Sequence, residues 1–284
     1  MTFLEKKDAK QREKIKEGEY MDIEFILKLS SYFIIYSFFG WILESIVKTF
    51  IEKKPVNSGF LHGPICPIYG FGAIIMFLFL NSLKGKYIIL FIVSFFILSI
   101  WEYFVGWALE KVFHTKYWDY TPNRFNIKGR VCLMNSLFWG ILGVVFIEWI
   151  HPFIDGKLML VPQNILIFCN VIAYLALLVD FISSVVKVKG FDSKLKLLAE
   201  IGENIKEKLE ELKNTVQEHK TENIEEMQNV IDELKQKQKT LARKLYKHTI
   251  RLKKAFPTMK SENISEFLNQ KLDYMKKIGK NKEK

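Results

Sequence analysis

Five long apolar stretches constrain this chain more than any other feature of its sequence. A helix needs about 20 apolar residues to cross the hydrocarbon core of a bilayer, and each stretch has about that length. The stretches are unbroken, whereas the strands of a membrane β-barrel alternate apolar and polar residues. We therefore predict an all-α, polytopic membrane bundle of about five transmembrane helices. They are expected at about Ile23–Phe50, Pro64–Ser82, Lys86–Val112, Val131–Ile150 and Pro162–Val186.

The rest of the chain is rich in Lys and Glu, so a lipid-facing part is joined to a water-facing part. In the C-terminal region, apolar residues recur at spacings of three and four between Leu198 and Val216 and again between Ile224 and Leu245. This pattern predicts a coiled coil or a helical hairpin. The heptads favour a homodimer only if the two halves do not fold back on each other. The predicted domains are a charged N-terminal arm (1–21), a transmembrane permease-like domain (22–190), a coiled-coil or helical tail (191–256) and a short basic amphipathic segment (257–284).

Lys and Arg residues in the short loops predict the orientation, because they are retained on the cytoplasmic side. The first and third loops carry more of them than the second and fourth. With five spans, the C-terminus is then also cytoplasmic, whereas the basic N-terminal arm would lie outside, against the rule. The charges of the tail are interleaved in sign rather than clustered, so no nucleic acid is expected as a partner.

Ionisable residues inside the apolar stretches are expensive to bury in lipid, and each is a functional hypothesis. Glu102, Gly106 and Glu110 follow one another at four-residue steps, which places them on one helix face. We expect this face to point into the bundle, where it either binds cargo or locks helices together. Glu44 lies four residues before Lys48, a spacing that favours an ion pair.

The other polar residues of the spans receive plainer predictions. Asp180 is expected to form an interhelical hydrogen bond, and Glu148 is expected at the membrane interface. His62, His114 and His151 are interpreted as ordinary polar residues. No Cys or His spacing suggests a metal site, and no cofactor is expected.

The segment NSGFLHGPICPIYGFG, residues 57–72, is unusually rich in Gly and Pro. Pro64 and Pro67 prevent a regular helix, and the glycines permit tight backbone conformations. Irregular backbone at membrane depth occurs where it is buried or lines a polar cavity, and broken helices form substrate sites in transporters. The alternative is a tight connector between two helices.

The third loop combines aromatic residues with cations in FHTKYWDYTPNRFNIKGR, residues 113–130. Its aromatic residues suit the headgroup level of a membrane, and its cations suit an anionic headgroup or cargo. Alternatively, the cations only enforce the topology. Signatures of phosphate-binding loops and of known hydrolases are missing, so we predict neither an ATPase nor any catalytic residue.

Four blocks, FFGWILES, NSGFLHGPICPIYGFG, WEYFVGWALEKVF and YWDYTPNRFNIKGRVCL, occur in the order of one protein family. Over about residues 30–190 the chain resembles the bacterial family named putative ABC-transporter type IV, or putative ABC transporter permease. The resemblance implies a multi-pass protein of the bacterial cytoplasmic membrane. Asn57 and Ser58 stand where an Arg or a similar polar residue is expected beside the glycine. The residues carried over as a hypothetical substrate site are Glu44, Gly59, Gly63, Pro64, Pro67, Tyr69, Gly70, Glu102, Trp118, Asp119, Tyr120, Asn126 and Arg130.

Three functions follow from these observations. The leading hypothesis is a permease-like transporter subunit in the lipid bilayer, with a polar pocket and either a separate ATPase subunit or an ion gradient as its energy source. The second is a membrane-anchored scaffold or regulator that binds a cytoplasmic protein through residues 193–250. The third is a membrane-embedded enzyme acting on lipid, with Glu102 or Asp119 as acid or base.

Overall fold

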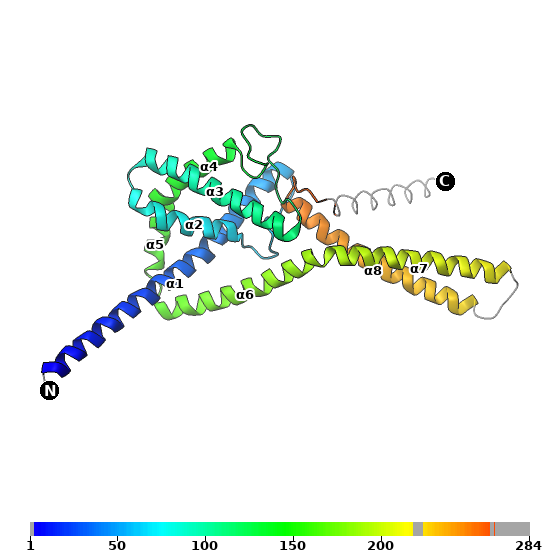
Figure 1. Ribbon diagram of the computed structural model, residues 1–284, viewed down its shortest axis with the longest axis horizontal. Coiled ribbons are helices and arrows are strands. Elements are labelled where there is room, and N and C mark those ends of the chain that lie inside the picture. Colours follow the sequence, from blue (N-terminus) through cyan, green and yellow to red (C-terminus); the bar gives the residue numbers. More distant parts are fainter. Residues whose placement is uncertain (1–2, 218–223, 262–263, 265–284) are drawn as a thin grey trace. The chain divides into compact units, whose positions relative to one another are not determined.

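The computed structural model describes residues 3–217, 224–261 and 264 (Figure 1). Within these residues it is built from helices, with two isolated β-bridges and no strand. The prediction of an all-helical chain is therefore confirmed. The elements are α1 (Phe3–Glu52), α2 (Pro67–Leu80), the 3₁₀ turn η1 (Asn81–Leu83), α3 (Tyr87–Phe113), α4 (Leu133–Val145), the π-helical turn η2 (Phe146–Ile150), α5 (His151–Leu158), α6 (Gln163–Lys189), α7 (Phe191–Gln217) and α8 (Ile224–Ala255).

Four helical segments among the described residues are long and apolar enough to cross a membrane. They are Ile23–Glu52, Tyr87–Phe113, Leu133–Leu158 and Gln163–Lys189. The remaining predicted span corresponds to a shorter apolar helix, Pro67–Leu83. Because about 17 residues is the lower limit for a spanning helix, the count of five spans stays a prediction.

The chain divides into two compact units, which are described separately. The membrane unit consists of Met1–Ala108 and Asp119–Ile182, and the tail unit consists of Leu109–Trp118 and Ser183–Lys284. The domain boundaries drawn from the sequence follow composition, and they stay predictions.

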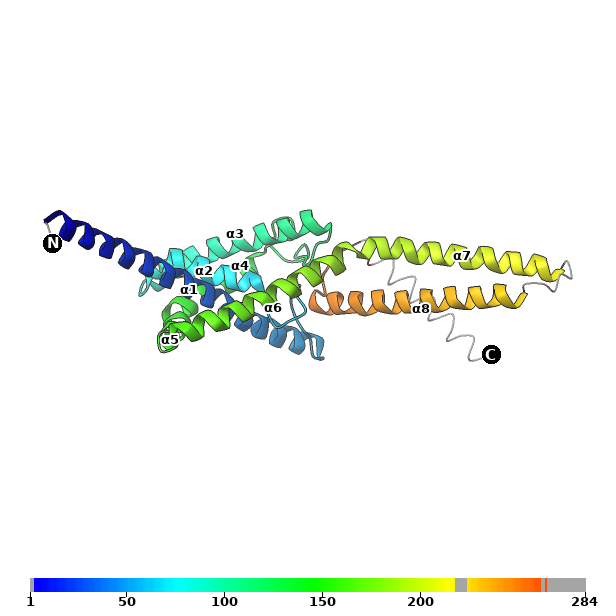
Figure 2. The same cartoon turned by 90° about the horizontal axis from the view of Figure 1, so that it is seen from below.

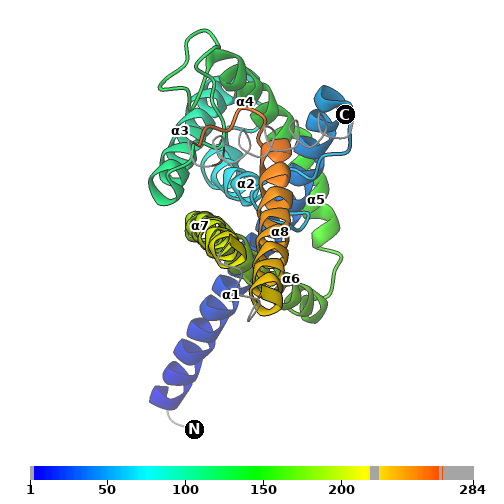
Figure 3. The same ribbon diagram turned by 90° about the vertical axis from the view of Figure 1, so that its right-hand side faces the viewer.

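Small residues bring the helices of the membrane unit close together. Helices α2, α3 and α4 lie together in all three views (Figures 1, 2 and 3), and α1 packs along α2. A Cβ atom on Gly70 of α2 would meet the main-chain oxygen of Phe33 on α1 at 2.6 Å, so only glycine fits there. On α4, a Cβ atom on Gly143 would collide with Ser94 of α3. Such contacts between small residues are typical of packed membrane helices.

The interior of the membrane unit is mostly apolar, and much of its outer surface is apolar as well. The core includes Tyr36, Met76, Leu90, Leu98 and Ile147, all buried. Many large apolar side chains are exposed instead, above all along α6. A surface of this kind is expected where a helix faces lipid rather than water.

The tail unit contains an antiparallel helix pair. Helices α7 and α8 run side by side in opposite directions (Figure 2), with a seam of buried apolar residues between them. The seam consists of Ile201 and Ile205 from α7 and Ile231, Leu245 and Leu252 from α8. The apolar repeat is thus used within one chain, so it gives no argument for a homodimer, and the coiled coil stays a prediction.

After α8 the chain pairs with the segment that follows α3. Lys116 and Lys260 exchange two backbone hydrogen bonds of 3.0 and 2.8 Å, and the ring of Tyr117 meets that of Phe256 edge to face. The amphipathic segment predicted at 257–284 lies outside the described residues, apart from 257–261 and 264.

Candidate functional site

A buried carboxylate lies in the membrane unit, on helix α3. Glu102 of α3 is 4% exposed and accepts hydrogen bonds from three side chains. Its Oε1 accepts from the hydroxyl of Tyr120 and from Nδ2 of Asn135, both at 3.2 Å. Its Oε2 accepts from Nε1 of Trp139 at 3.0 Å. We call these four residues the Glu102 cluster.

The cluster depends on the close contact of α3 with α4. Asn135 and Trp139 are four residues apart on α4, so both project from the same face. Beside them, the hydroxyl of Ser99 on α3 donates to that of Ser136 on α4 at 2.6 Å. With the contact at Gly143, this bond fixes the register that places both donors against Glu102.

Tyr120 reaches the cluster from the loop between α3 and α4. Its backbone N–H donates to the carbonyl of Gly129 at 2.8 Å, which closes the loop. Burial, followed by the nearby charge of Glu102, raises the pKa of Tyr120 above its usual value near 10. The phenol therefore stays protonated and acts as a hydrogen-bond donor.

A small cavity adjoins the Glu102 carboxylate. Its volume is about 30 Å³, which is enough for a water molecule and too little for an organic cargo. Tyr69 of α2 lies at this cavity and within electrostatic reach of both Glu44 and Glu102. The lining residues are Ile68, Tyr69, Gly72, Met76, Leu98, Trp101, Glu102, Trp139 and Leu142.

The Gly- and Pro-rich segment before α2 forms a loop that is held by helices α1 and α6. The backbone N–H groups of His62 and Gly63 donate to the two carboxylate oxygens of Asp180 at 3.1 and 2.7 Å. The sequence did not suggest this loop as the partner of Asp180. Gly59 adopts a φ of +92°, which favours glycine, and Pro67 begins α2.

Two other predicted site residues, Glu44 and Arg130, form their own contacts outside the Glu102 cluster. Glu44 forms the ion pair expected with Lys48, at 2.6 Å, and lies 3.5 Å from the sulfur of Cys66. Arg130 donates to the hydroxyl of Tyr103 at 3.0 Å, and its guanidinium lies over the same ring.

Several predicted residues shape loops instead of facing the cavity. Asp119 accepts from the backbone and the hydroxyl of Thr121, and Asn126 bonds the backbone of its own loop. Pro64 is exposed, and Trp118 belongs to the tail unit. Of the predicted set, the structure brings Glu102, Tyr120 and Tyr69 together, and Gly70 serves the contact of α2 with α1.

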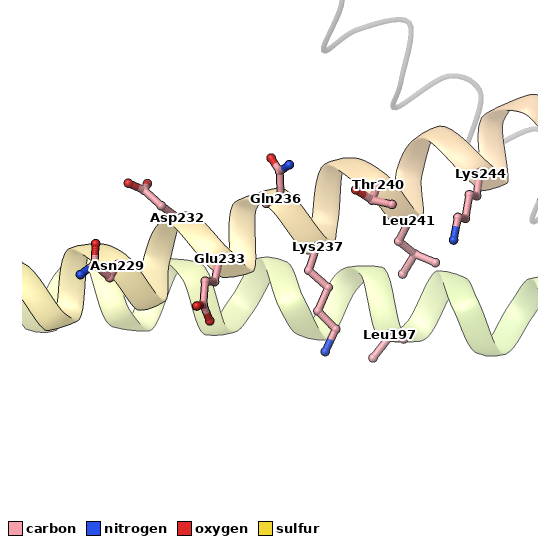
Figure 4. Close-up of a pocket in the computed structure, with 9 residues that line it drawn as sticks. All are labelled: Leu197, Asn229, Asp232, Glu233, Gln236, Lys237, Thr240, Leu241 and Lys244. Carbon is pink, nitrogen blue, oxygen red and sulfur yellow. The ribbon is translucent and has the colours of Figure 1, made fainter.

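The tail unit has a larger hollow, of about 920 Å³, between α7 and α8 (Figure 4). Most of its lining side chains come from α8 and are exposed, including Asp232, Glu233 and Lys237. A binding site for a small molecule usually buries its ligand against apolar walls with a few convergent polar groups. The residues around this hollow are mostly charged or polar and exposed to solvent, so the Glu102 cluster is the stronger candidate.

Sequence reasoning missed two members of the cluster, Asn135 and Trp139. A usable signal was present, because the two are one helical turn apart near the start of an apolar stretch. It also missed a second group of polar side chains, around His151, in which Tyr36 pairs with the imidazole at 2.8 Å.

Comparison with protein families gives one match. The family model described as Putative ABC-transporter type IV matches residues 31–185, which is more than half of the chain. The chain belongs to this family. The predicted resemblance is thus confirmed, and the matched range contains the whole Glu102 cluster. Neither the curated proteins nor the solved structures contain a match to this member of the type IV family.

The family and the four apolar helices together identify a membrane protein of transporter type.

Proposed function

We propose that this chain is the membrane-embedded subunit of a transporter and that the Glu102 cluster is where it holds polar cargo. The observation that carries the proposal is a carboxylate, 4% exposed, in the interior of a membrane-spanning helix. Ionisable side chains at such depth mark substrate or ion pathways in many membrane proteins.

The chemistry of the cluster favours a cationic or amine-bearing cargo. The three groups that contact Glu102 are a phenol, an amide and an indole, and all three are neutral. They satisfy the carboxylate oxygens by hydrogen bonds, but they do not balance a negative charge. A cation entering the cavity would supply the missing charge.

The cavity of about 30 Å³ corresponds to a closed conformation. Passage of cargo then requires α2 and α3 to separate next to Tyr69 and Trp101, which both line it. The small residues at the helix contacts, such as Gly72, leave the helices able to slide without large side chains interlocking.

We further propose a separate ATPase subunit as the partner. The family description supports this pairing, and the sequence has no phosphate-binding loop of its own. In this proposal the protein is not an enzyme, it lies in the bacterial cytoplasmic membrane, and the tail extends into the cytoplasm.

Purification of the full-length chain from its native membrane in lipid nanodiscs tests the partner. An ATPase recovered in a fixed ratio supports the proposal, whereas its repeated absence would overturn the pairing.

The site is tested by comparing cells that lack the protein with cells carrying the wild type, Glu102→Gln or Glu148→Gln. We expect cells with Glu102→Gln to have the same small-molecule pools as cells that lack the protein. Cells with Glu148→Gln should have the same pools as the wild type. Normal pools in Glu102→Gln would make Glu102 a structural residue.

A further inference from the structure

The membrane unit contains a second polar cluster, at the other end of the helix that carries Asn135 and Trp139. His151 and Asp155 lie one turn apart on α5, and Tyr32 and Tyr36 lie one turn apart on α1. The hydroxyl of Tyr36 is 2.8 Å from Nδ1 of His151, and the hydroxyl of Tyr32 donates to Oδ1 of Asp155. We call these four residues the His151 cluster.

The imidazole is enclosed by aromatic rings. His151 is 4% exposed, and its ring centroid lies 4.6 Å from that of Phe77, 5.0 Å from that of Tyr32 and 5.6 Å from that of Phe146. Such a wall leaves little of the ring open to water, and Tyr36 bonds Nδ1 at its polar edge. A half-buried acid and a buried base, each bonded by a phenol, are thereby placed one helical turn apart.

An irregular turn of the helix directs this pair towards α1. The π-helical turn η2 ends at Ile150, directly before His151. Pro152 lacks an N–H, so the carbonyl four residues earlier loses its regular helical partner, and the helix widens. A π-helical turn inserts extra backbone, which rotates the side chains that follow, and such turns are frequent at functional sites.

We propose that the His151 cluster is a proton-binding site, with His151 as the acceptor and Asp155 as its counter-charge. A hydronium ion gives one proton to the neutral imidazole, so that one O–H bond breaks, one N–H bond forms and a water molecule is released. The Nδ1–H group then donates to the oxygen of Tyr36, and the carboxylate of Asp155 offsets the new charge. Chains of His and acidic residues within spans carry protons in pumps and transporters.

Titratable groups from three parts of the membrane unit surround the imidazole. The titratable groups facing it are Tyr32 and Tyr36 of α1 and Asp155 of α5, and Lys84 acts on it from the connection before α3. Burial of the ring opposes the imidazolium most strongly, the carboxylate of Asp155 favours it, and the ammonium of Lys84 opposes it. Histidine is also the side chain whose ordinary range, near 6.5, lies closest to physiological pH.

Binding of the proton does not depend on the proposed function, but its coupling to transport does. Protonation would strengthen the contact of α1 with α5, whereas release would weaken it. The two states of this contact give the membrane unit a way to respond to a proton gradient.

Nitrogen NMR of histidine-labelled, full-length protein in nanodiscs tests the site, because the chain has only 5 histidines. The His151 signals are identified by their loss in His151→Gln. We expect them to change from neutral imidazole to imidazolium between about pH 8 and about pH 5. Signals that stay neutral, or stay charged, across this range would overturn the proposal.

Tyr36→Phe supplies a second test, which does not need the His151 variant to fold. We expect it to shift the Nδ1 signal of His151, because the hydrogen bond to that atom is lost. Tyr174→Phe is the matched control, since Tyr174 is a phenol of the same unit that bonds the carbonyl of Ser30 instead. An unchanged His151 signal in Tyr36→Phe would remove Tyr36 from the site.

The coupling of proton binding to transport is tested by measuring the small-molecule pools of cells that carry His151→Gln. Altered small-molecule pools together with a titrating His151 in the wild type support it. If His151 titrates but the pools are normal, the coupling is wrong while the proton site stands. If cells that carry Glu102→Gln have normal small-molecule pools while His151 titrates, the proposed function fails and the proton site stands.

Discussion

The two polar clusters of the membrane unit both hold ionisable side chains among apolar helices, but they bond these side chains in different ways. In the Glu102 cluster, one acid accepts hydrogen bonds from three neutral donors. In the His151 cluster, an acid and a base share the site, and each is bonded by one tyrosine. The first arrangement fixes a negative group in place, whereas the second can exchange a proton without leaving either partner unbonded.

Their separation along the helix supports different roles. Trp139 and His151 are 12 residues apart in the sequence, which corresponds to about 18 Å along a helix. All residues between them on this helix are apolar except Glu148, which accepts from the backbone of Gly85. An apolar layer thus lies between the two clusters, so a cation at Glu102 and a proton at His151 occupy distinct sites.

The largest expected effect is that of Glu102→Ala. This change removes the acceptor of Tyr120 and Trp139 and leaves Asn135 only its bond to the hydroxyl of Tyr120, and each unsatisfied buried group costs about 1–3 kcal/mol. We expect a loss of about 3 kcal/mol or more in the free energy of unfolding, measured by steric trapping in bicelles. Glu148→Ala is the control, and its loss should stay below about 1 kcal/mol because Glu148 has one backbone partner at the surface. Equal losses would show that Glu102 is not specially stabilised.

A smaller effect is expected for Asp155→Ala in the His151 cluster. Only the hydroxyl of Tyr32 loses its acceptor, so the loss should be about 1–2 kcal/mol in the same assay. Tyr32→Phe alone should cost about as much, and the double variant Tyr32→Phe/Asp155→Ala should cost less than the sum of the two. Additive losses would contradict a direct bond between the two side chains.

The sequence predicted the parts of this comparison that depend on one helix alone. The burial of Glu102 followed from its place in a long apolar stretch, and the ion pair of Glu44 with Lys48 followed from their spacing. The all-helical class and the family followed from apolar runs and from ordered blocks of sequence.

The parts that depend on the register between helices were missed. Asn135 and Trp139 reach Glu102 only because Gly143 and Ser94 let α4 approach α3 closely. His151 was interpreted as an ordinary polar residue, because its partner Tyr36 lies 115 residues earlier. A regular helix through Pro152 would also have pointed it elsewhere, and nothing in the apolar pattern reveals a π-helical turn.

Trp139→Phe should sharpen the description of the Glu102 cluster. The ring is kept while the N–H bonded to Oε2 is lost, so the expected cost is about 1 kcal/mol. Phe138→Leu, at a neighbouring exposed position of α4, is the control and should change the stability less. No cost in Trp139→Phe would mean that a water in the adjoining cavity replaces the indole.

Pro152→Ala should have the smallest effect on stability and the sharpest effect on geometry. Alanine restores an N–H and favours a regular helix, so the gain and the loss of contacts should cancel to within about 1 kcal/mol. If Pro152 causes the π-helical turn, the turn relaxes to α-helix and rotates His151 away from Tyr36. The Nδ1 signal of His151 should then move as it does in Tyr36→Phe, while the signals of the other histidines stay in place. An unchanged His151 signal would show that packing against Phe77 and Phe146, rather than the proline, sets the direction of the imidazole.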